Sequence, residues 1–308
     1  MSATQSRHAS RAPFAVTVAL PIGVLFTAVA SLATLLGVIA TAPVEVELPA
    51  PAAALVLPDV EVTATPVLNP CADAEVQAAL AAGDDEAVVK AFGGGGEFQA
   101  AVAIGNAPCI PLDDPAHEWV VVNKLRALTP IDFTPASVTP SNLRGTSRSV
   151  SMRPAAADAL NRLADAARAA GAGVMGVNNA YRSYGLQKIT YSSFVRSEGR
   201  AGADAGSARP GHSEHQTGLA VDVVACTPGC GGIGQFAGTA QSRWVAEHAW
   251  EFGFIVRYED GATATTGYMP EPWHLRYIGV ELARAYHQGG FHTLEDFFGL
   301  PPAPDYSE

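Results

Sequence analysis

Four residues in the second half of the chain have the side-chain types that bind a metal ion and use it in catalysis: His215, Asp222, Glu271 and His274. Two imidazoles and one carboxylate suit a catalytic zinc ion, which keeps three protein ligands and leaves a fourth position for water. Asp222 lies in an otherwise apolar run, where an unpaired carboxylate would carry a large desolvation penalty. The sequence therefore predicts one zinc ion per chain, bound by His215, Asp222 and His274.

Glu271 is the predicted general base. It precedes His274 by three residues, so its carboxylate can lie beside the metal without binding it. A base that acts on a metal-activated water needs this position. Glu214, next to His215, is the competing candidate. In an extended segment successive side chains point to opposite sides, so we expect Glu214 to face away from the metal and to be dispensable.

Three segments, in this order, resemble the VanY-type D-alanyl-D-alanine carboxypeptidase family. They are Tyr181-Arg182-Ser183, Ser213-Glu-His-Gln-Thr-Gly-Leu-Ala-Val-Asp222 and Glu271-Pro-Trp-His274. That family is related to the D-Ala-D-Ala dipeptidases, phage L-alanyl-D-glutamate endolysins, lysostaphin-type peptidases and the hedgehog signalling domain. The resemblance covers roughly residues 117–298 and shows no departure at the metal positions.

The resemblance implies roles for individual residues. It assigns the same three zinc ligands and the same base, Glu271, that the residue types indicate. Arg182 would meet the substrate carboxylate or the developing oxyanion, as a fixed cation can. Three further residues would contact the substrate: Ser213, Gln187 and Tyr181.

The implied function is removal of the terminal D-Ala from peptidoglycan stem peptides that end in D-Ala-D-Ala. One alternative is an endopeptidase of the same fold that cuts L-Ala-D-Glu or a cross-bridge. The choice between these would lie in cleft-closing loops such as residues 197–211. The other alternative is a wall-binding or signalling module that keeps the metal without hydrolysis. Glu271 and Arg182 argue against it, because a structural metal needs neither.

An uncharged N-terminal segment indicates export. Residues 12–44 contain no charged side chain, and a helix of this length can cross a hydrocarbon layer of ~30 Å. Arg7 and Arg11 precede the segment and acidic residues follow it, which favours a cytoplasmic N-terminus. We expect a single-pass protein of the cell membrane with an extracytoplasmic catalytic domain. Ala40-Thr41-Ala42 resembles a cleavage site, so secretion after signal cleavage is the alternative.

The net charge of -11 limits the classes of partner. Such a surface repels anionic polymers, which disfavours nucleic-acid binding. The expected partners are the stem peptide and, through the N-terminal segment, the membrane.

The four cysteines form an even set, which favours disulfides in an oxidising compartment. We expect the pairs Cys71–Cys109 and Cys226–Cys230. Zinc binding by the thiolates of Cys226 and Cys230 is the alternative reading of their spacing.

The catalytic residues need a framework of short helices and strands. Helices are predicted near residues 154–170 and 239–252, and another begins after a cap at Ser183. Strands are predicted at residues 174–177, 219–224, 254–258 and 274–277. Because these elements are mixed without regular βαβ alternation, we expect an α+β domain. The resemblance implies a hedgehog/D-Ala-D-Ala peptidase-like fold, with a small antiparallel sheet flanked by helices and an N-terminal membrane helix.

This framework divides the chain into six parts. We expect a cytoplasmic tail (1–12), a transmembrane anchor or signal segment (13–42), a Pro-rich stalk (43–70), a small helical disulfide-closed subdomain (71–112), the zinc D,D-carboxypeptidase catalytic domain (113–300) and a tail (301–308).

Overall fold

The structure is a computed structural model that describes residues 69–147 and 149–307, and these belong to one compact unit. The tail at 1–12, the apolar segment at 13–42 and all but the end of the stalk at 43–70 lie outside the described residues. Within the described part of the chain, no helix combines the length and the apolar character needed to span a membrane.

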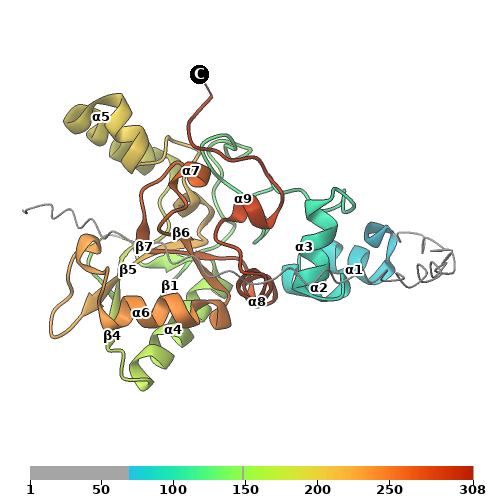
Figure 1. Cartoon of the computed structure of the whole chain (residues 1–308), viewed down its shortest axis with the longest axis horizontal. Coiled ribbons are helices and arrows are strands. Elements are labelled where there is room, and N and C mark those ends of the chain that lie inside the picture. Colours follow the sequence, from blue (N-terminus) through green and yellow to red (C-terminus); the bar gives the residue numbers. More distant parts are fainter. Residues whose placement is uncertain (1–68, 148, 308) are drawn as a thin grey trace, which may run out of the picture. The chain divides into compact units, whose positions relative to one another are not determined.

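A five-stranded sheet carries the site (Figure 1). Its strands, in spatial order, are β2 (Arg144–Gly145), β4 (Val174–Asn179), β5 (Ala220–Cys226), β7 (Glu271–Tyr277) and β6 (Phe254–Tyr258). The pairs from β4 to β6 are antiparallel, as expected. The edge strand β2 departs from the expectation, since it runs parallel to β4. A helix lies between these two strands in the sequence, and parallel neighbours need such a crossover. A two-residue antiparallel pair, β1 (Thr139–Pro140) with β3 (Ser151–Met152), lies outside the sheet.

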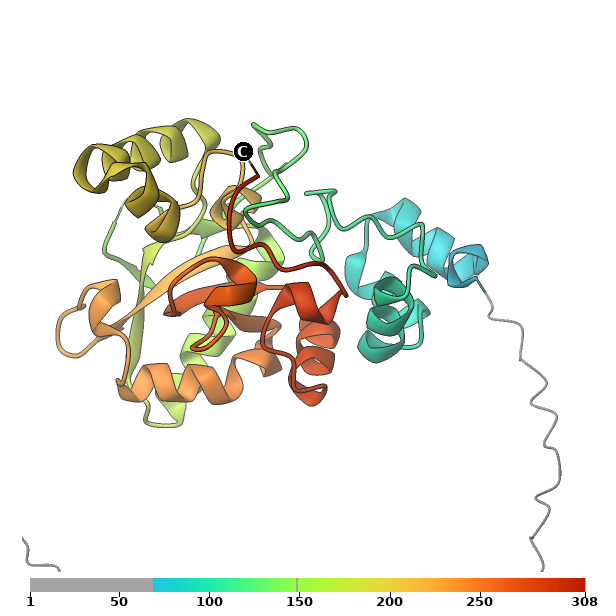
Figure 2. The ribbon, with the colours of Figure 1, turned by 45° about the horizontal axis from the view of Figure 1, so that its top comes forward.

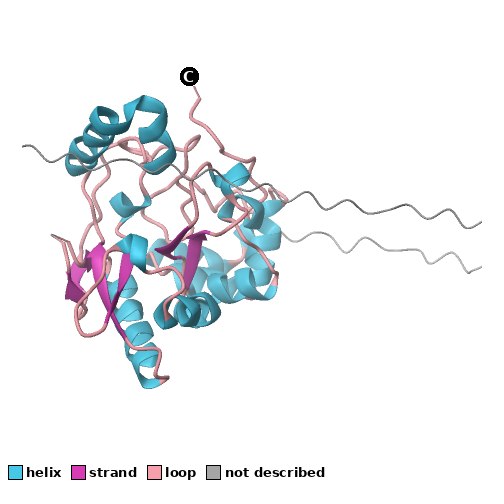
Figure 3. Ribbon diagram, turned by 60° about the vertical axis from the view of Figure 1, so that its left-hand side comes forward, coloured by secondary structure: helices cyan, strands magenta, loops and turns pink. Residues whose placement is uncertain are grey.

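Two helices cover one face of the sheet, and Figure 3 shows the strands flanked by helices. They are α4 (Pro154–Ala169) and α6 (Ala240–His248). Leu160 and Leu163 of α4 pack with Val245 of α6 in the main hydrophobic core. The helix expected over 239–252 ends earlier than predicted, because its last part, Ala249–Phe252, forms a 3-10 turn. That turn is closed by Gly253, whose φ of 86° favours glycine.

Two of the predicted metal ligands, Asp222 and His274, lie on the face of the sheet opposite to α4 and α6. Val221 and Val223 of β5 and Leu275 of β7 point into the core under α4 and α6. Successive side chains of a strand face opposite sides, so Asp222 and His274 point away from that core. The mixture of sheet and helices confirms the α+β class.

The long helix α5 (Tyr184–Gly206) connects two segments of the predicted site. The Ser183 side chain accepts a hydrogen bond from the backbone N–H of Leu186 at 3.3 Å, which confirms the predicted N-cap. Gly199, with φ of 72°, interrupts the helix. In Figures 1 and 2, α5 projects from the sheet on the side away from α4 and α6.

The N-terminal described part is helical, as expected. It contains α1 (Ala74–Ala82), α2 (Asp85–Ala91) and α3 (Gly95–Ala103). These pack with α8 (Val280–Gln288) and α9 (Leu294–Phe297) around a second hydrophobic core that includes Phe98, Trp119 and Leu282. A short helix, α7 (Thr263–Thr266), lies between β6 and β7.

Both expected disulfides are present. Cys71 is bonded to Cys109 and closes the helical part, while Cys226 is bonded to Cys230 and fixes the turn after β5. The alternative in which Cys226 and Cys230 bind zinc as thiolates is therefore wrong.

The expected C-terminal tail packs against loops near the site. Tyr306 Oη accepts a hydrogen bond from the Arg209 backbone N–H at 2.8 Å and lies 3.0 Å from Tyr268 Oη. The Lys124 ammonium donates to the carbonyl of Pro304 at 3.2 Å. Residues 303–306 thereby connect the loop before Ser213 to the loop before Glu271.

A half-buried residue, Glu118, joins the helical part to the catalytic part through its backbone. Its backbone N–H donates to Asp85 of α2 at 2.6 Å. Burial, and then the charge of Asp85, raise the pKa of the Glu118 carboxyl to about 7 from 4.5. Between pH 4.5 and about pH 7, the Glu118 carboxyl keeps its proton in the folded protein but has lost it in the unfolded chain. A rise in pH therefore favours unfolding.

We expect the Glu118→Gln variant to lose this pH dependence. The unfolding free energy of the unmodified protein should fall by roughly 1–3 kcal/mol more than that of the variant between about pH 5 and pH 8. Urea unfolding followed by tryptophan fluorescence at both pH values measures the difference. Parallel pH profiles would show that Glu118 titrates alike in the folded and unfolded states.

Candidate active site

His215 is held by a short 3-10 helix, Glu214–Thr217, which ends at Gly218. The φ of 72° at Gly218 lets the chain turn directly into β5. His215 Nδ1 lies 2.9 Å from the carbonyl oxygen of Ala180, to which it can donate. Its Nε2 is then the free acceptor, and this atom lies 3.3 Å from Asp222 Oδ2.

Asp222 and His274 lie opposite each other on neighbouring strands. The antiparallel register of β5 and β7 pairs the two residues directly. Asp222 Oδ1 lies 3.2 Å from His274 Nδ1 but makes no well-aligned hydrogen bond to any described group. Burial would raise the pKa of Asp222, yet the neighbouring His215 and His274 hold it well below its usual value. Asp222 is therefore an ionised carboxylate in a buried position.

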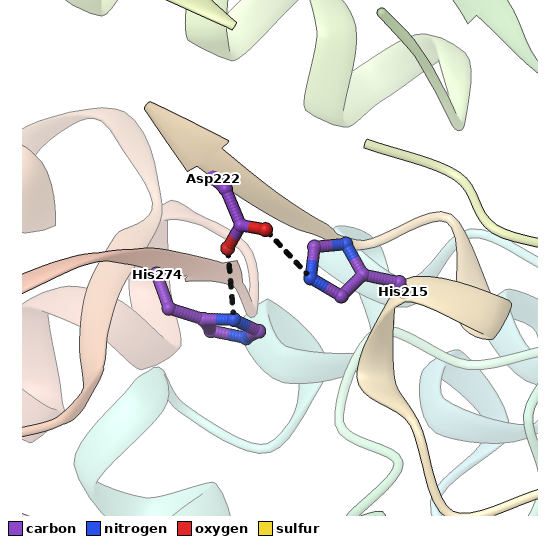
Figure 4. A group of neighbouring side chains, drawn as sticks. All are labelled: His215, Asp222 and His274. Atoms are coloured by element: carbon purple, nitrogen blue, oxygen red, sulfur yellow. Dashed lines mark ion pairs between the residues drawn. The ribbon is translucent and has the colours of Figure 1, made fainter. Parts of the chain in front are cut away.

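The three predicted ligands converge on one point, as Figure 4 shows. Ligand atoms of His215, Asp222 and His274 all lie within 4.8 Å of one another, and all three residues are buried. Burial lowers the pKa of His215, which favours the neutral imidazole that binds metals. For His274 burial acts in the same direction, but hydrogen bonds to Asp222 and Glu214 raise its pKa to about 9. The site thus favours positive charge, and its donor set fits a zinc ion.

Glu271 lies beside this group without belonging to it. It is the first residue of β7, and its Oε2 lies 3.6 Å from His274 Nδ1. Its side chain is 22% exposed, so it is reachable from outside, whereas the Asp222 side chain is 11% exposed. Burial raises the pKa of Glu271 to about 7. A carboxyl with this pKa can accept and release a proton near neutral pH.

Arg182 supplies the cation of the site. It lies three residues after the end of β4, and its backbone N–H donates to the carbonyl of His215 at 3.1 Å. Burial lowers the pKa of the guanidinium, while Asp222 and Glu271 act in the opposite direction. The side chain donates to Ser213 Oγ at 3.4 Å, and its Nε is buried with no hydrogen-bond partner among the described groups. The guanidinium therefore keeps donor capacity for a bound molecule.

The three predicted substrate contacts differ in their surroundings. Ser213 is buried and accepts the bond from Arg182. Tyr181 is half-buried and its backbone N–H donates to Ser151. Gln187 is fully buried, and its amide nitrogen donates to the carbonyl of Ala208 at 2.5 Å. In the structure Gln187 thus fixes the segment that follows α5, and its amide is not exposed to a substrate.

Glu214 does not face away from the site, so this expectation is wrong. The segment is a 3-10 helix and not an extended strand, so neighbouring side chains need not point to opposite sides. Glu214 is buried, and its Oε2 lies 3.2 Å from His274 Nε2. Its other oxygen accepts hydrogen bonds from Arg257 and Arg276. The sequence contained one signal for this, since Arg257 interrupts the apolar strand β6 as Asp222 interrupts β5.

The part of the chain that contains these residues is similar to known carboxypeptidases. The family described as VanY, D-alanyl-D-alanine carboxypeptidase, matches residues 149–280, a span that includes Arg182, His215, Asp222, Glu271 and His274. The putative carboxypeptidase YodJ of Bacillus subtilis is 40% identical over 147 residues, which are 48% of this chain and 53% of that protein. A D-alanyl-D-alanine carboxypeptidase of Enterococcus faecalis is 44% identical over 97 residues, or 31% of this chain and 34% of that protein.

The fold of the chain is also similar to that of a solved carboxypeptidase structure. The solved structure of the LdcB LD-carboxypeptidase has a TM-score of 0.55 and 35% sequence identity to this chain, and the match covers 60% of this chain and 86% of that one. By contrast, the match covers only about half of the length of YodJ and about a third of the length of the Enterococcus faecalis carboxypeptidase.

Proposed function

Because the chain belongs to the VanY family of D-alanyl-D-alanine carboxypeptidases, we propose that it is a zinc D,D-carboxypeptidase of the cell wall. Its substrate is a peptidoglycan stem peptide ending in D-Ala-D-Ala, from which it removes the terminal D-Ala. The observation that carries the proposal is the convergence of His215, Asp222 and His274, with Glu271 beside them.

The mechanism follows from the positions of Glu271 and Arg182. Zinc, when bound by the three ligands, makes a water molecule more acidic and polarises the scissile carbonyl. Glu271 takes a proton from the attacking water while the water oxygen bonds to the carbonyl carbon. The same carboxyl then delivers the proton to the leaving amine as the C–N bond breaks. Arg182 holds the substrate carboxylate or the negative charge that develops on the carbonyl oxygen, a contact whose loss costs about 3 kcal/mol.

We place this reaction outside the cytoplasm. The uncharged segment at 12–44 supports a single-pass anchor, with secretion after cleavage as the alternative. The disulfides Cys71–Cys109 and Cys226–Cys230 support an oxidising compartment.

A second candidate is an L,D-carboxypeptidase, which cuts the bond between an L residue and a terminal D residue. The likeness to the LdcB LD-carboxypeptidase favours it. Both activities need the same zinc chemistry, so the difference lies in how the residue before the scissile bond is held. The described site residues serve either reaction.

The test supplies both substrates to the purified full chain loaded with zinc. We expect free D-Ala from a pentapeptide stem ending in D-Ala-D-Ala, measured with a D-amino-acid oxidase assay, and loss of activity in EDTA that zinc restores. Release of D-Ala only from the tetrapeptide stem would support the L,D-carboxypeptidase. Internal fragments seen by mass spectrometry would indicate an endopeptidase. Zinc binding without any cleavage of either stem would favour a non-catalytic module.

A further inference from the structure

A buried group of charged residues lies directly behind His274. Glu214 has no exposed side-chain surface, and its Oε2 is 3.2 Å from His274 Nε2. Its Oε1 accepts from Arg257 Nε and from Arg276 Nη1, both at 2.9 Å. Both arginine side chains are also fully buried. One oxygen of the Glu214 carboxylate thus accepts from two guanidiniums, and the other oxygen faces the imidazole of His274.

The two arginines are themselves fixed by further partners. Arg257 donates to both carboxylate oxygens of Glu295, at 3.0 and 2.8 Å, and Asn123 also donates to Glu295 at 2.9 Å. Arg276 Nη2 donates to the carbonyls of Glu118 and Val120, at 2.9 and 2.7 Å. Because both guanidiniums are held in place, their hydrogen bonds fix the orientation of the Glu214 carboxylate on the side away from His274.

Two glutamates balance two arginines in this group, which allows all four to remain ionised while buried. Burial would raise the pKa of Glu214, but Arg257 and Arg276 lower it below its usual range. Removing such charges from water still costs several kcal/mol per ion, and apolar side chains would often fill the same space at least as favourably. Stability of the fold is therefore a weak reason for a carboxylate at this point.

The two imidazoles are held in different ways. His215 Nδ1 faces a neutral acceptor, the carbonyl of Ala180, so Nε2 is left for a ligand. His274 Nε2 faces an ionised carboxylate, so Nδ1 is left, and this atom points to Asp222. A carboxylate that accepts the second N–H of a metal-binding histidine fixes its orientation and makes it a stronger ligand.

We propose that Glu214 is a positioning residue: it accepts the Nε2–H of His274 and thereby presents Nδ1 of that imidazole to the metal. The inference rests on the proposed function, because it assumes a zinc ion at His215, Asp222 and His274. Glu214 transfers no proton to the substrate in this scheme. It determines which nitrogen of His274 binds and how tightly the metal is held.

The first test identifies the metal-binding nitrogen in the full chain labelled with ¹⁵N-histidine and loaded with zinc. Comparison with the spectrum of His274→Gln assigns the His274 signals. We expect Nε2 to carry the proton and Nδ1 to bind zinc. A proton on Nδ1, or zinc on Nε2, would overturn the role of Glu214. No zinc-dependent change in any histidine would instead overturn the proposed function from which the inference starts.

The second test compares zinc affinity, by competition with a chromophoric chelator, in Glu214→Gln and in the matched variant Glu295→Gln. The two changes remove one charge each from the same buried group, but only Glu214 reaches His274. We expect zinc affinity to fall ~10- to 100-fold in Glu214→Gln. In Glu295→Gln the fall should be clearly smaller, because that change loosens Arg257 but leaves the Glu214 carboxylate on His274.

Equal affinities in the two variants would show that Glu214 serves the fold alone. If Glu214→Gln fails to fold, the nitrogen assignment in the unmodified chain decides the question, because it needs no change at Glu214.

Discussion

We expect the replacement of Glu271 by alanine to leave zinc content near one per chain and to lower kcat by at least ~10²-fold, because only proton transfer should be removed. The carboxylate lies beside the three proposed ligands, 3.6 Å from His274 Nδ1, and is not one of the three residues whose ligand atoms converge. Glu271→Gln, which keeps the shape of the side chain, should lose a comparable factor. Metal analysis together with D-Ala release measures both quantities.

The matched control for Glu271 is Glu251→Ala. Glu251 is an exposed carboxylate that pairs with His248 at 2.8 Å, away from the ligands. It should retain both zinc and turnover. If Glu271→Ala remained as active as this control, another carboxylate would be the base, and Glu214 would be the first to examine.

We expect the replacement of His274 by alanine to remove zinc and activity together, because one of the three proposed protein ligands is lost. The change also leaves the buried carboxylates of Asp222 and Glu214 without the imidazole that lies between them. Zinc content after dialysis and D-Ala release should fall in parallel.

His287→Ala is the matched control for His274. His287 lies on α8, is exposed and stacks on Trp250, with ring centroids 4.4 Å apart. This variant should keep zinc and activity. Full zinc content in His274→Ala would show that the metal uses a different third ligand.

The sequence predicted most of the framework because apolar periodicity marks buried elements. The strand Phe254–Tyr258 and the helix from Pro154 occur where the pattern indicated. Asp222 stood out because a charge in an apolar strand needs a partner. The fold class and the convergence of His215, Asp222 and His274 follow from such local signals together with the order of the motifs.

Features that depend on distant contacts were not predictable in this way. Glu214 seemed a rival base because its true partners, Arg257 and Arg276, lie 43 and 62 residues away in sequence. The buried amide of Gln187 has its partner in the carbonyl of Ala208, at the other end of α5. The C-terminal residues resembled a free tail because a single aromatic, Tyr306, makes their main contacts.

The direct pairing of Asp222 with His274 limits how the length of the chain can change during evolution. Inserting or deleting one residue within β5 or β7 shifts the register by one position and turns the Asp222 or His274 side chain to the opposite face of the sheet. Length changes should be tolerated instead in connections that leave this register intact, such as the segment between Cys230 and α6. Homologous chains should therefore differ in length in such connections and keep the spacing from Glu271 to Tyr277 constant.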